Sequence, residues 1–206
     1  MGEFDLIARY FTRPVRKAAL GVGDDCALIA PAPGMQLAIS SDMLVEGRHF
    51  FADVDPEALG HKALAVNLSD LAACGAKPLA FTLALSLPRV NEAWLAGFSR
   101  GLLALADAHG CELVGGDTTQ GPLNICITVF GEVPTGQALL RSGARPGDDI
   151  YVSGTLATPG WRWRRCSGTL PCPPRCWPAR ASGWSAPPRA WPWAWRCAVW
   201  PAVPWM

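Results

Sequence analysis

The composition of the chain changes abruptly after Thr158, and this break limits which part can fold. Residues 159–206 contain no Asp, Glu, Lys, Ile, Phe, Tyr, Asn, Gln or His, but they hold nine of the ten Trp, ten of the nineteen Pro and seven Arg. A Pro every few residues blocks a regular helix or a central strand, and no hydrophobic period of 2 or 3.6 is present. We therefore expect a disordered tail over residues 159–206 and a folded body over residues 1–158.

Two interpretations of this tail stay open. Its residue types are largely those with GC-rich codons, which favours a GC-rich gene read in a shifted frame after about Thr158. The alternative is a genuine Arg- and Trp-rich segment that binds a membrane or nucleic acid through cationic and stacking contacts. The many prolines disfavour a membrane-active helix, so the shifted frame is the preferred interpretation.

The charge of the body argues against nucleic acid and membrane partners. Residues 1–158 carry 11 basic and 17 acidic groups, whereas the tail carries only basic ones. The N-terminus is acidic and periodic, and the body has no apolar run long enough to span a bilayer, so we expect a cytoplasmic protein. Four cysteines stand singly in apolar surroundings, and we expect them to be small buried side chains of a reducing compartment: Cys26, Cys74, Cys111 and Cys126.

Helix and strand patterns alternate along the body. Helices are predicted over residues 3–12, 56–75 and 91–110, and strands over residues 36–45, 77–88, 111–116 and 123–133. Asp55 and Asn91 stand at the N-cap positions of the two long helices, and Gly75 and Gly110 at their ends. The mixed order predicts an α+β fold in which a mixed sheet is covered by helices on one face.

Several aspartates follow glycines or serines where loops begin or predicted strands end. They occur in the stretches GVGDDC (Asp24 and Asp25), SSD (Asp42) and GGD (Asp117). Taken singly, such an Asp is more typical of a turn or a cap than of a ligand site. Asp70 differs, because its spacing from Ala63 and Val66 puts it on the apolar face of its helix. We expect a buried carboxylate there, which needs a cation as its partner.

Together these residues indicate a hard cation and a phosphate. Carboxylates and hydroxyls without a His or Cys cluster suit Mg²⁺, which leaves coordination positions for water and phosphate. Glycine-rich turns beside them free backbone N–H groups for phosphate oxygens. The residues therefore predict metal-assisted phosphoryl chemistry on a nucleotide or another phosphorylated substrate.

Five motifs carry a resemblance to a known family. GVGDDCA, SDMLVEGRHF, DPEALGHKALAVNLSDLAACGAKP, LVGGDTTQGPL and LLRSGARPGDDIYVSGTL resemble, in order and spacing, the motifs of the thiamine-monophosphate kinases, over residues 2 to about 156. This family is similar to aminoimidazole-ribonucleotide synthetase, selenophosphate synthetase and a hydrogenase-maturation protein. The stretches SDMLVEGRHF and GEFDLIARY favour the thiamine enzymes within that group.

The resemblance implies transfer of the γ-phosphoryl group of ATP to thiamine monophosphate, with several Mg²⁺ ions, ATP as co-substrate and no protein nucleophile. The residues it implies are Asp25, Ser40, Ser41, Asp42, Asp70 and Asp117 for Mg²⁺, Gly116, Asp117 and Arg141 for ATP, and His49 for the thiamine substrate. The residues themselves leave two alternatives. His49 suits a surface or half-buried histidine, and Arg141 suits an ion pair with Asp148 or Asp149.

The resemblance also implies a domain organisation and an oligomeric state. Residues 1–135 correspond to an ATP- and metal-binding, dimerisation domain, residues 136–158 to the start of a second αβ domain, and residues 159–206 to nothing in the family. We expect a homodimer that joins two sheets into a barrel-like core, and impaired kinase activity because the second domain is absent. Two alternatives are a non-catalytic module that binds a membrane or nucleic acid through its tail, and a sibling enzyme acting on another phosphorylated or carboxylated substrate.

Overall fold

The computed structural model describes residues 2–149, so the predictions for the tail lie outside the described residues. The elements are α1 (Glu3–Tyr10), β1 (Met35–Val45), α2 (Pro56–Ala73), β2 (Lys77–Leu87), α3 (Glu92–His109), β3 (Glu112–Gln120), β4 (Asn124–Pro134) and the short 3₁₀ helix η1 (Arg141–Gly143). The predicted elements are confirmed with one substantial shift in a boundary. β3 runs four residues beyond the predicted end at residue 116.

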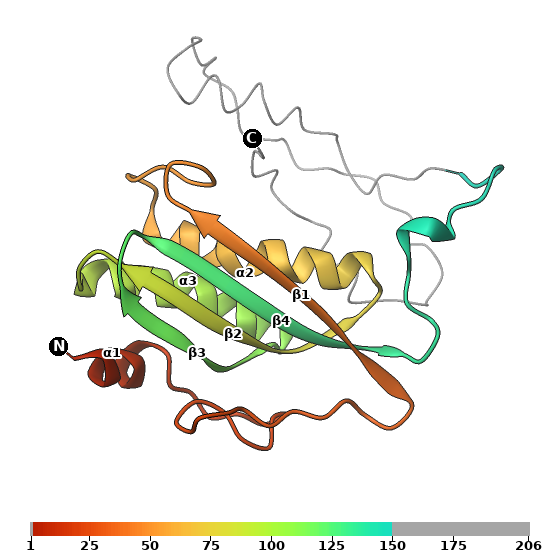
Figure 1. The fold of residues 1–206 in the computed structure, drawn as a ribbon, viewed down its shortest axis with the longest axis horizontal. Helices are drawn as coiled ribbons and strands as arrows, with labels where there is room; N and C mark the ends of the chain where they lie inside the picture. The colour runs from red at the N-terminus through yellow and green to blue at the C-terminus, as the bar shows by residue number, and fades with distance from the viewer. Residues whose placement is uncertain (1, 150–206) are drawn as a thin grey trace, which may run out of the picture.

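The four strands form one mixed sheet in the order β1-β4-β2-β3. β4 is antiparallel to both of its neighbours, and β2 and β3 are parallel. α2 and α3 lie together across one face of the sheet, which confirms the predicted α+β architecture (Figure 1). β1 and β3 are therefore the two open edges of the sheet within residues 2–149.

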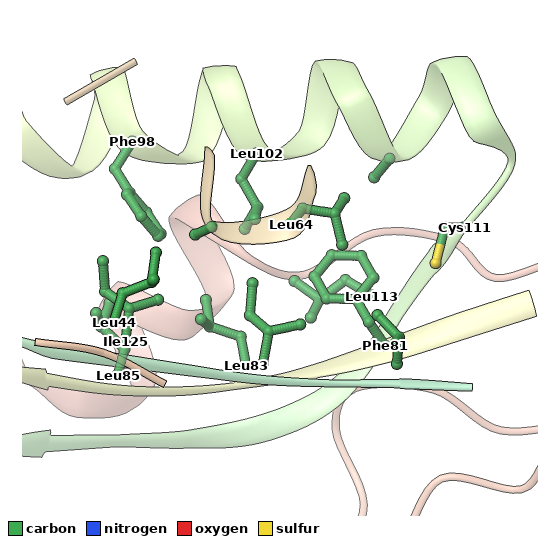
Figure 2. Close-up of a cluster of buried hydrophobic side chains, with 14 of the residues drawn as sticks. Leu44, Leu64, Phe81, Leu83, Leu85, Phe98, Leu102, Cys111, Leu113 and Ile125 are labelled. Carbon is green, nitrogen blue, oxygen red and sulfur yellow. The ribbon is translucent and has the colours of Figure 1, made fainter. Parts of the chain in front are cut away.

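The core lies between this helix layer and the sheet. Figure 2 shows Leu64 of α2 and Phe98 of α3 directed toward Phe81, Leu83 and the neighbouring side chains of the strands. Phe81 and Phe98 are fully buried, and burial of side chains of this size contributes about 1.5–3 kcal/mol each. This apolar layer fixes the position of both long helices on the sheet.

The ends of the long helices follow the predicted caps. The side chain of Asp55 accepts a hydrogen bond from the backbone N–H of Ala58 at 2.8 Å, and that of Asn91 accepts one from Trp94 at 3.1 Å. α3 ends at Gly110, which has a left-handed conformation with φ +57°. These contacts satisfy backbone groups that a helix leaves unpaired at its ends.

The opposite face of the sheet is covered at one end only. Val15, Ala18 and Ile29 of the N-terminal segment pack with Ala80 and Val114 in a small second cluster. Glu112 holds this segment, since its carboxylate accepts hydrogen bonds from three successive backbone N–H groups, those of Arg16, Lys17 and Ala18.

The β1 end of the same face carries exposed apolar side chains. Ile39 is 60% exposed and Met43 is 52% exposed. Their partners across the ladder are Phe130 and Cys126 of β4, which share this face. The uncovered part of the sheet thus exposes large apolar side chains on both sides of the Ser41–Thr128 pair.

The cysteine prediction is only partly right. Cys111 is buried and Cys126 is half-buried, but Cys26 and Cys74 are exposed. Cys26 lies on the loop that carries the two adjacent aspartates, and Cys74 caps the C-terminal end of α2. Apolar neighbours in sequence do not bury a residue on a loop or at a helix end. In the part of the chain that the structure describes, no helix meets the length and hydropathy that a membrane span requires.

Candidate functional site

A cavity of about 560 Å³ lies beside the β3 edge of the sheet. We call it the β3 pocket. The glycine-rich loop brings Asp24 and Asp25 to one side of it, and Gly115–Asp117 of β3 line another. Apolar side chains of α1, among them Phe4 and Ile7, complete the wall. Two sequence motifs that are ninety residues apart, GDD and GGD, therefore share one cavity, as the sequence predicts for a phosphate and metal site.

Backbone geometry explains why glycine occupies position 116. Gly116 has φ +144°, and a Cβ there would lie 1.9 Å from the carbonyl oxygen of Leu83 on β2. Only a residue without a side chain allows β3 to lie this close to β2. Gly115 and Gly116 line the β3 pocket with backbone atoms.

A β-bulge determines the direction of Asp117. In the β2–β3 register Phe81 pairs with Leu113 and Thr82 pairs with Gly115, so Val114 is an extra residue on β3. Side chains alternate between the two faces of a strand, and one extra residue reverses every later position. Asp117 consequently pairs with Ala84 on the face away from α2 and α3.

Asp24 and Asp25 have different environments. The carboxylate of Asp24 accepts the backbone N–H of Asp25 at 2.8 Å, a local turn contact. Asp25 is exposed and lines the pocket, and within residues 2–149 its carboxylate makes no hydrogen bond or ion pair. Asp24 thus serves the turn, and Asp25 is the better candidate for a cation ligand.

A second group of candidate residues lies between β1 and α2, at the other edge of the sheet. The hydroxyl of Ser40 donates a hydrogen bond to the carboxylate of Asp70 at 2.7 Å. Burial and the charge of Asp70 raise the pKa of Asp42, while His49 acts in the opposite direction. Asp42, Asp70 and His49 are therefore close enough to interact electrostatically. We call these three residues and Ser40 the β1 group.

Two predictions about this group are wrong in detail. Asp70 is exposed rather than buried, because it lies near the C-terminal end of α2 beside an edge strand, where no further strand covers the helix. Asp42 and Asp117 lie within β1 and β3 rather than at strand ends. The carboxylates project from the open edges of the sheet, which the residue pattern alone does not indicate.

The side chain of Ser41 points to the opposite face of β1 from those of Ser40 and Asp42, because side chains alternate along a strand. Its hydroxyl lies 3.0 Å from the hydroxyl of Thr128 and donates to the carbonyl of Ile127 at 3.2 Å. Thr128 is its partner in the β1–β4 ladder. The Ser41 side chain thus lies on the face opposite Ser40 and Asp42, so the structure does not bring the two serine hydroxyls together.

Sequence reasoning missed two residues of α2 that hold the β1 group. Asn67 is fully buried, and its side-chain oxygen accepts the backbone N–H of Asp42 at 3.1 Å. Lys62 is half-buried and donates to the backbone carbonyl of His49 at 2.6 Å. Burial lowers the pKa of Lys62. The only signal in the sequence is the spacing of Asn67 and Asp70, which are three residues apart and lie on adjacent turns of one flank of the helix.

The predicted site residues do not form one cluster. The β3 pocket and the β1 group lie at opposite edges of the sheet. Arg141 is exposed on η1, after β4. Within residues 2–149 no three His, Cys, Asp or Glu side chains come together as a metal site. The predicted single cage of carboxylates is therefore divided into two parts in one copy of the chain.

Comparison with known proteins identifies the class of this fold and site. Residues 23–133 match the family model described as "AIR synthase related protein, N-terminal domain". This range includes the glycine-rich loop, the whole sheet to Val133 and both groups of carboxylates. The chain belongs to this family.

Within that class the chain is similar to thiamine-monophosphate kinases. It is 57% identical over 158 residues to the enzyme of Salmonella typhimurium and 58% identical to that of Escherichia coli K12, covering 75% of this chain and 48% of each relative. The solved structure of thiamine-monophosphate kinase from Stenotrophomonas maltophilia is 46% identical, with a TM-score of 0.70 over 81% of this chain. The chain thus spans about half the length of the curated relatives it matches, and the resemblance predicted from the motifs is confirmed.

One solved neighbour is a ligand complex, "AaThiL complexed with AMPPCP and TMP". It is 32% identical, with a TM-score of 0.60, and the match covers 81% of this chain and 53% of that one. A structure of the hydrogenase-maturation protein HypE in complex with ATP is 25% identical, with a TM-score of 0.59. The hydrogenase-maturation protein named from the sequence motifs therefore shares this fold.

Proposed function

We propose that this chain carries the nucleotide- and metal-binding part of a kinase that transfers the γ-phosphoryl group of ATP to thiamine monophosphate, giving thiamine diphosphate. The observation that carries the proposal is the β3 pocket, where the carboxylates of the GDD loop lie opposite the bare backbone of the GGD motif. The similarity to thiamine-monophosphate kinases supports the choice of substrate. A cytoplasmic location, where ATP is available, is part of the same proposal.

The donor atoms fit Mg²⁺. Asp25, Asp42, Asp70 and Asp117 offer carboxylate oxygens, the ligands that this ion prefers over nitrogen and sulfur. Burial and the neighbouring charge of Asp70 raise the pKa of Asp42, so a bound cation would favour its ionised form. Bound Mg²⁺ would neutralise phosphate charge and orient the reacting oxygens.

The remaining residues bind and orient the substrates. Gly115 and Gly116 line the β3 pocket with backbone atoms only, which suits the close approach of a phosphate oxygen. Arg141 supplies a guanidinium that can pair with a phosphate, and His49 presents a ring nitrogen to the thiamine substrate. Phosphoryl transfer depends on positioning and charge neutralisation, so no protein nucleophile is needed.

We further propose a homodimer formed through the uncovered face of the sheet. Ile39 and Met43 leave an apolar surface there, and burial in a second copy would remove it from water. A partner stacked on this face can bring its β3 edge near the β1 edge of the first copy. The β1 group of one copy and the β3 pocket of the other would then line one site around the β1 edge, because Asp42 projects on the helix side of that edge and not into the stacked faces.

Mixing two variants tests the shared site. Asp42→Asn and Asp117→Asn each remove one carboxylate from a different edge. If the site combines both copies, a heterodimer of the two variants keeps one intact site, so an equimolar mixture recovers about a quarter of the wild-type sites for Mg²⁺·ATP. Asp53→Asn, on an exposed loop, is the matched control and binds like wild type. If the mixture recovers no Mg²⁺·ATP binding, Asp42 and Asp117 of the same protomer belong to one site, and the shared site is refuted.

The kinase activity itself is tested by ADP release. The chain with Mg²⁺, ATP and thiamine monophosphate is expected to release ADP slowly and only when thiamine monophosphate is present, because it matches about half of each full-length relative. Asp25→Asn should abolish this release, and Asp53→Asn should not change it. Binding of ATP without any effect of thiamine monophosphate would exclude the proposed substrate. Turnover equal to that of a full-length relative would exclude the proposed impairment.

A further inference from the structure

The loop between β1 and α2 carries His49 and is held at few points. The backbone N–H groups of Arg48 and His49 both donate to the carbonyl of Val45, at 3.1 and 2.9 Å, and Gly47 N–H donates to Phe50 at 2.8 Å. The Phe50 side chain is buried in the core. These contacts shape the turn, but none of them joins His49 to the helix layer.

Lys62 makes that connection. Its ammonium group donates to the backbone carbonyl of His49 at 2.6 Å. Within residues 2–149 it has no carboxylate within ion-pair distance, so its charge is directed at a neutral oxygen. A half-buried lysine that donates to a single carbonyl contributes little to the stability of the loop, because burial disfavours its charge. This arrangement needs a reason beyond stability.

The His49 ring is also fixed in its orientation. Its Nδ1 accepts the backbone N–H of Val45 at 3.0 Å. A neutral imidazole with Nδ1 as acceptor carries its proton on Nε2, an assignment that follows from the hydrogen-bond geometry. The ring therefore offers a single N–H donor to a ligand beside Asp42 and Asp70.

We infer that Lys62 is a positioning residue for His49, which it holds so that the Nε2–H group faces an acceptor atom of the phosphorylated substrate. This inference rests on the proposed function, in which His49 contacts that substrate. Lys62 itself is half-buried under the loop and acts through His49, without contact to the substrate.

The first test measures the loop without any substrate. Histidine occurs three times in the chain, so ring ¹⁵N spectra resolve His49, assigned with His49→Gln. In Lys62→Met, which keeps the length of the side chain but removes the charge, the ring signals of His49 should shift and the amide of Val45 should exchange faster, by about tenfold. Lys62→Arg, which keeps a cationic donor, should restore most of both signals.

The second test measures binding in the full chain. Lys62→Met should weaken binding of thiamine monophosphate about tenfold and leave binding of Mg²⁺·ATP unchanged, and Lys62→Arg should recover part of the loss. Lys77→Met is the matched control, because Lys77 is exposed at the far end of the sheet and only pairs loosely with Glu132 at 3.8 Å. It should behave as wild type in both tests.

The two tests separate failure of the inference from failure of the proposed function. Wild-type chain that does not bind thiamine monophosphate refutes the proposed function, and the inference is then decided by the ring and amide signals. Unchanged His49 signals in Lys62→Met overturn the inference. Changes spread equally over α3 and β2, or equal loss of ATP and thiamine monophosphate binding, also overturn it, since they indicate a general structural role.

Discussion

Replacing Gly116 with alanine tests whether close backbone packing shapes the β3 pocket. The residue has φ +144°, and an added Cβ would lie 1.9 Å from the carbonyl oxygen of Leu83. Real Cβ contacts are essentially never below 3.0 Å, so β3 must move away from β2 by at least about 1.1 Å. A movement of that size disrupts the parallel ladder that carries Asp117.

The expected loss of stability follows from three contributions. The unfavourable φ costs about 1–3 kcal/mol, and forcing a methyl group against the neighbouring strand costs about 1–3 kcal/mol more. Alanine recovers about 0.4–1 kcal/mol because it restricts the unfolded chain. The free energy of unfolding should therefore fall by about 2–4 kcal/mol, which lowers the melting temperature of a domain of this size by roughly 5–15 °C.

The adjacent glycine provides the matched control. A Cβ at Gly115 would meet only Thr82 Cγ2, at 3.9 Å, which is ordinary van der Waals contact. Gly115→Ala should change the free energy of unfolding by less than about 0.5 kcal/mol. Urea unfolding followed by far-ultraviolet circular dichroism measures all three proteins. Equal midpoints for the Gly115 and Gly116 variants would refute the role assigned to the backbone.

Three further predictions concern charge and helix packing. Burial and the neighbouring Asp70 of α2 raise the pKa of Asp42, so ionisation of this carboxyl destabilises the fold as the pH rises. In the presence of EDTA, the Asp42→Asn variant should therefore have a higher melting temperature than wild type at pH 7. Below about pH 4 the two melting temperatures should be equal. Burial acts to raise the pKa of Glu112, but three backbone hydrogen bonds outweigh it and the pKa is lowered. Glu112→Gln should therefore lower the urea midpoint at neutral pH and lose this effect below about pH 4. Gly101→Ala places a Cβ 1.9 Å from the carbonyl oxygen of Glu57 on α2 and should reduce the free energy of unfolding by about 2 kcal/mol. Gly143→Ala is the control, because its Cβ meets open space, and it should leave the melting temperature measured by calorimetry unchanged.

Local signals in the sequence were sufficient for the helices, the strands and their caps. The side chains of Asp55 and Asn91 accept backbone N–H groups at the helix starts as predicted, because capping depends on residues close in sequence. The alternation of apolar residues likewise defined the core face of β4, where Ile125 and Ile127 are buried. The functional motifs were also recognisable, since GDD and GGD meet in one cavity.

Features that depend on tertiary geometry could not be predicted from the sequence. The extra residue Val114 directs Asp117 to the face of the sheet away from the helices. The sequence LVGGD contains no pattern that predicts a β-bulge at this position. Asp70 is exposed because α2 lies beside an edge strand, and the strand order is not visible in the helix. The role of Lys62 is hidden for the same reason, because its partner is a backbone carbonyl on a loop.

The placement of the carboxylates at opposite sheet edges has a thermodynamic consequence for the proposed homodimer. A ligand that joins Asp42 of one copy to Asp117 of the other holds the two copies together. Linkage then requires that dimerisation and ligand binding strengthen each other by the same factor. In that homodimer the exposed apolar side chains of Ile39 and Met43 would supply association without ligand. Burial and the charge of Asp70, which raise the pKa of Asp42, would make the remaining part depend on a bound cation. In the proposed homodimer, the order of strands in the sheet would couple assembly to ligand binding.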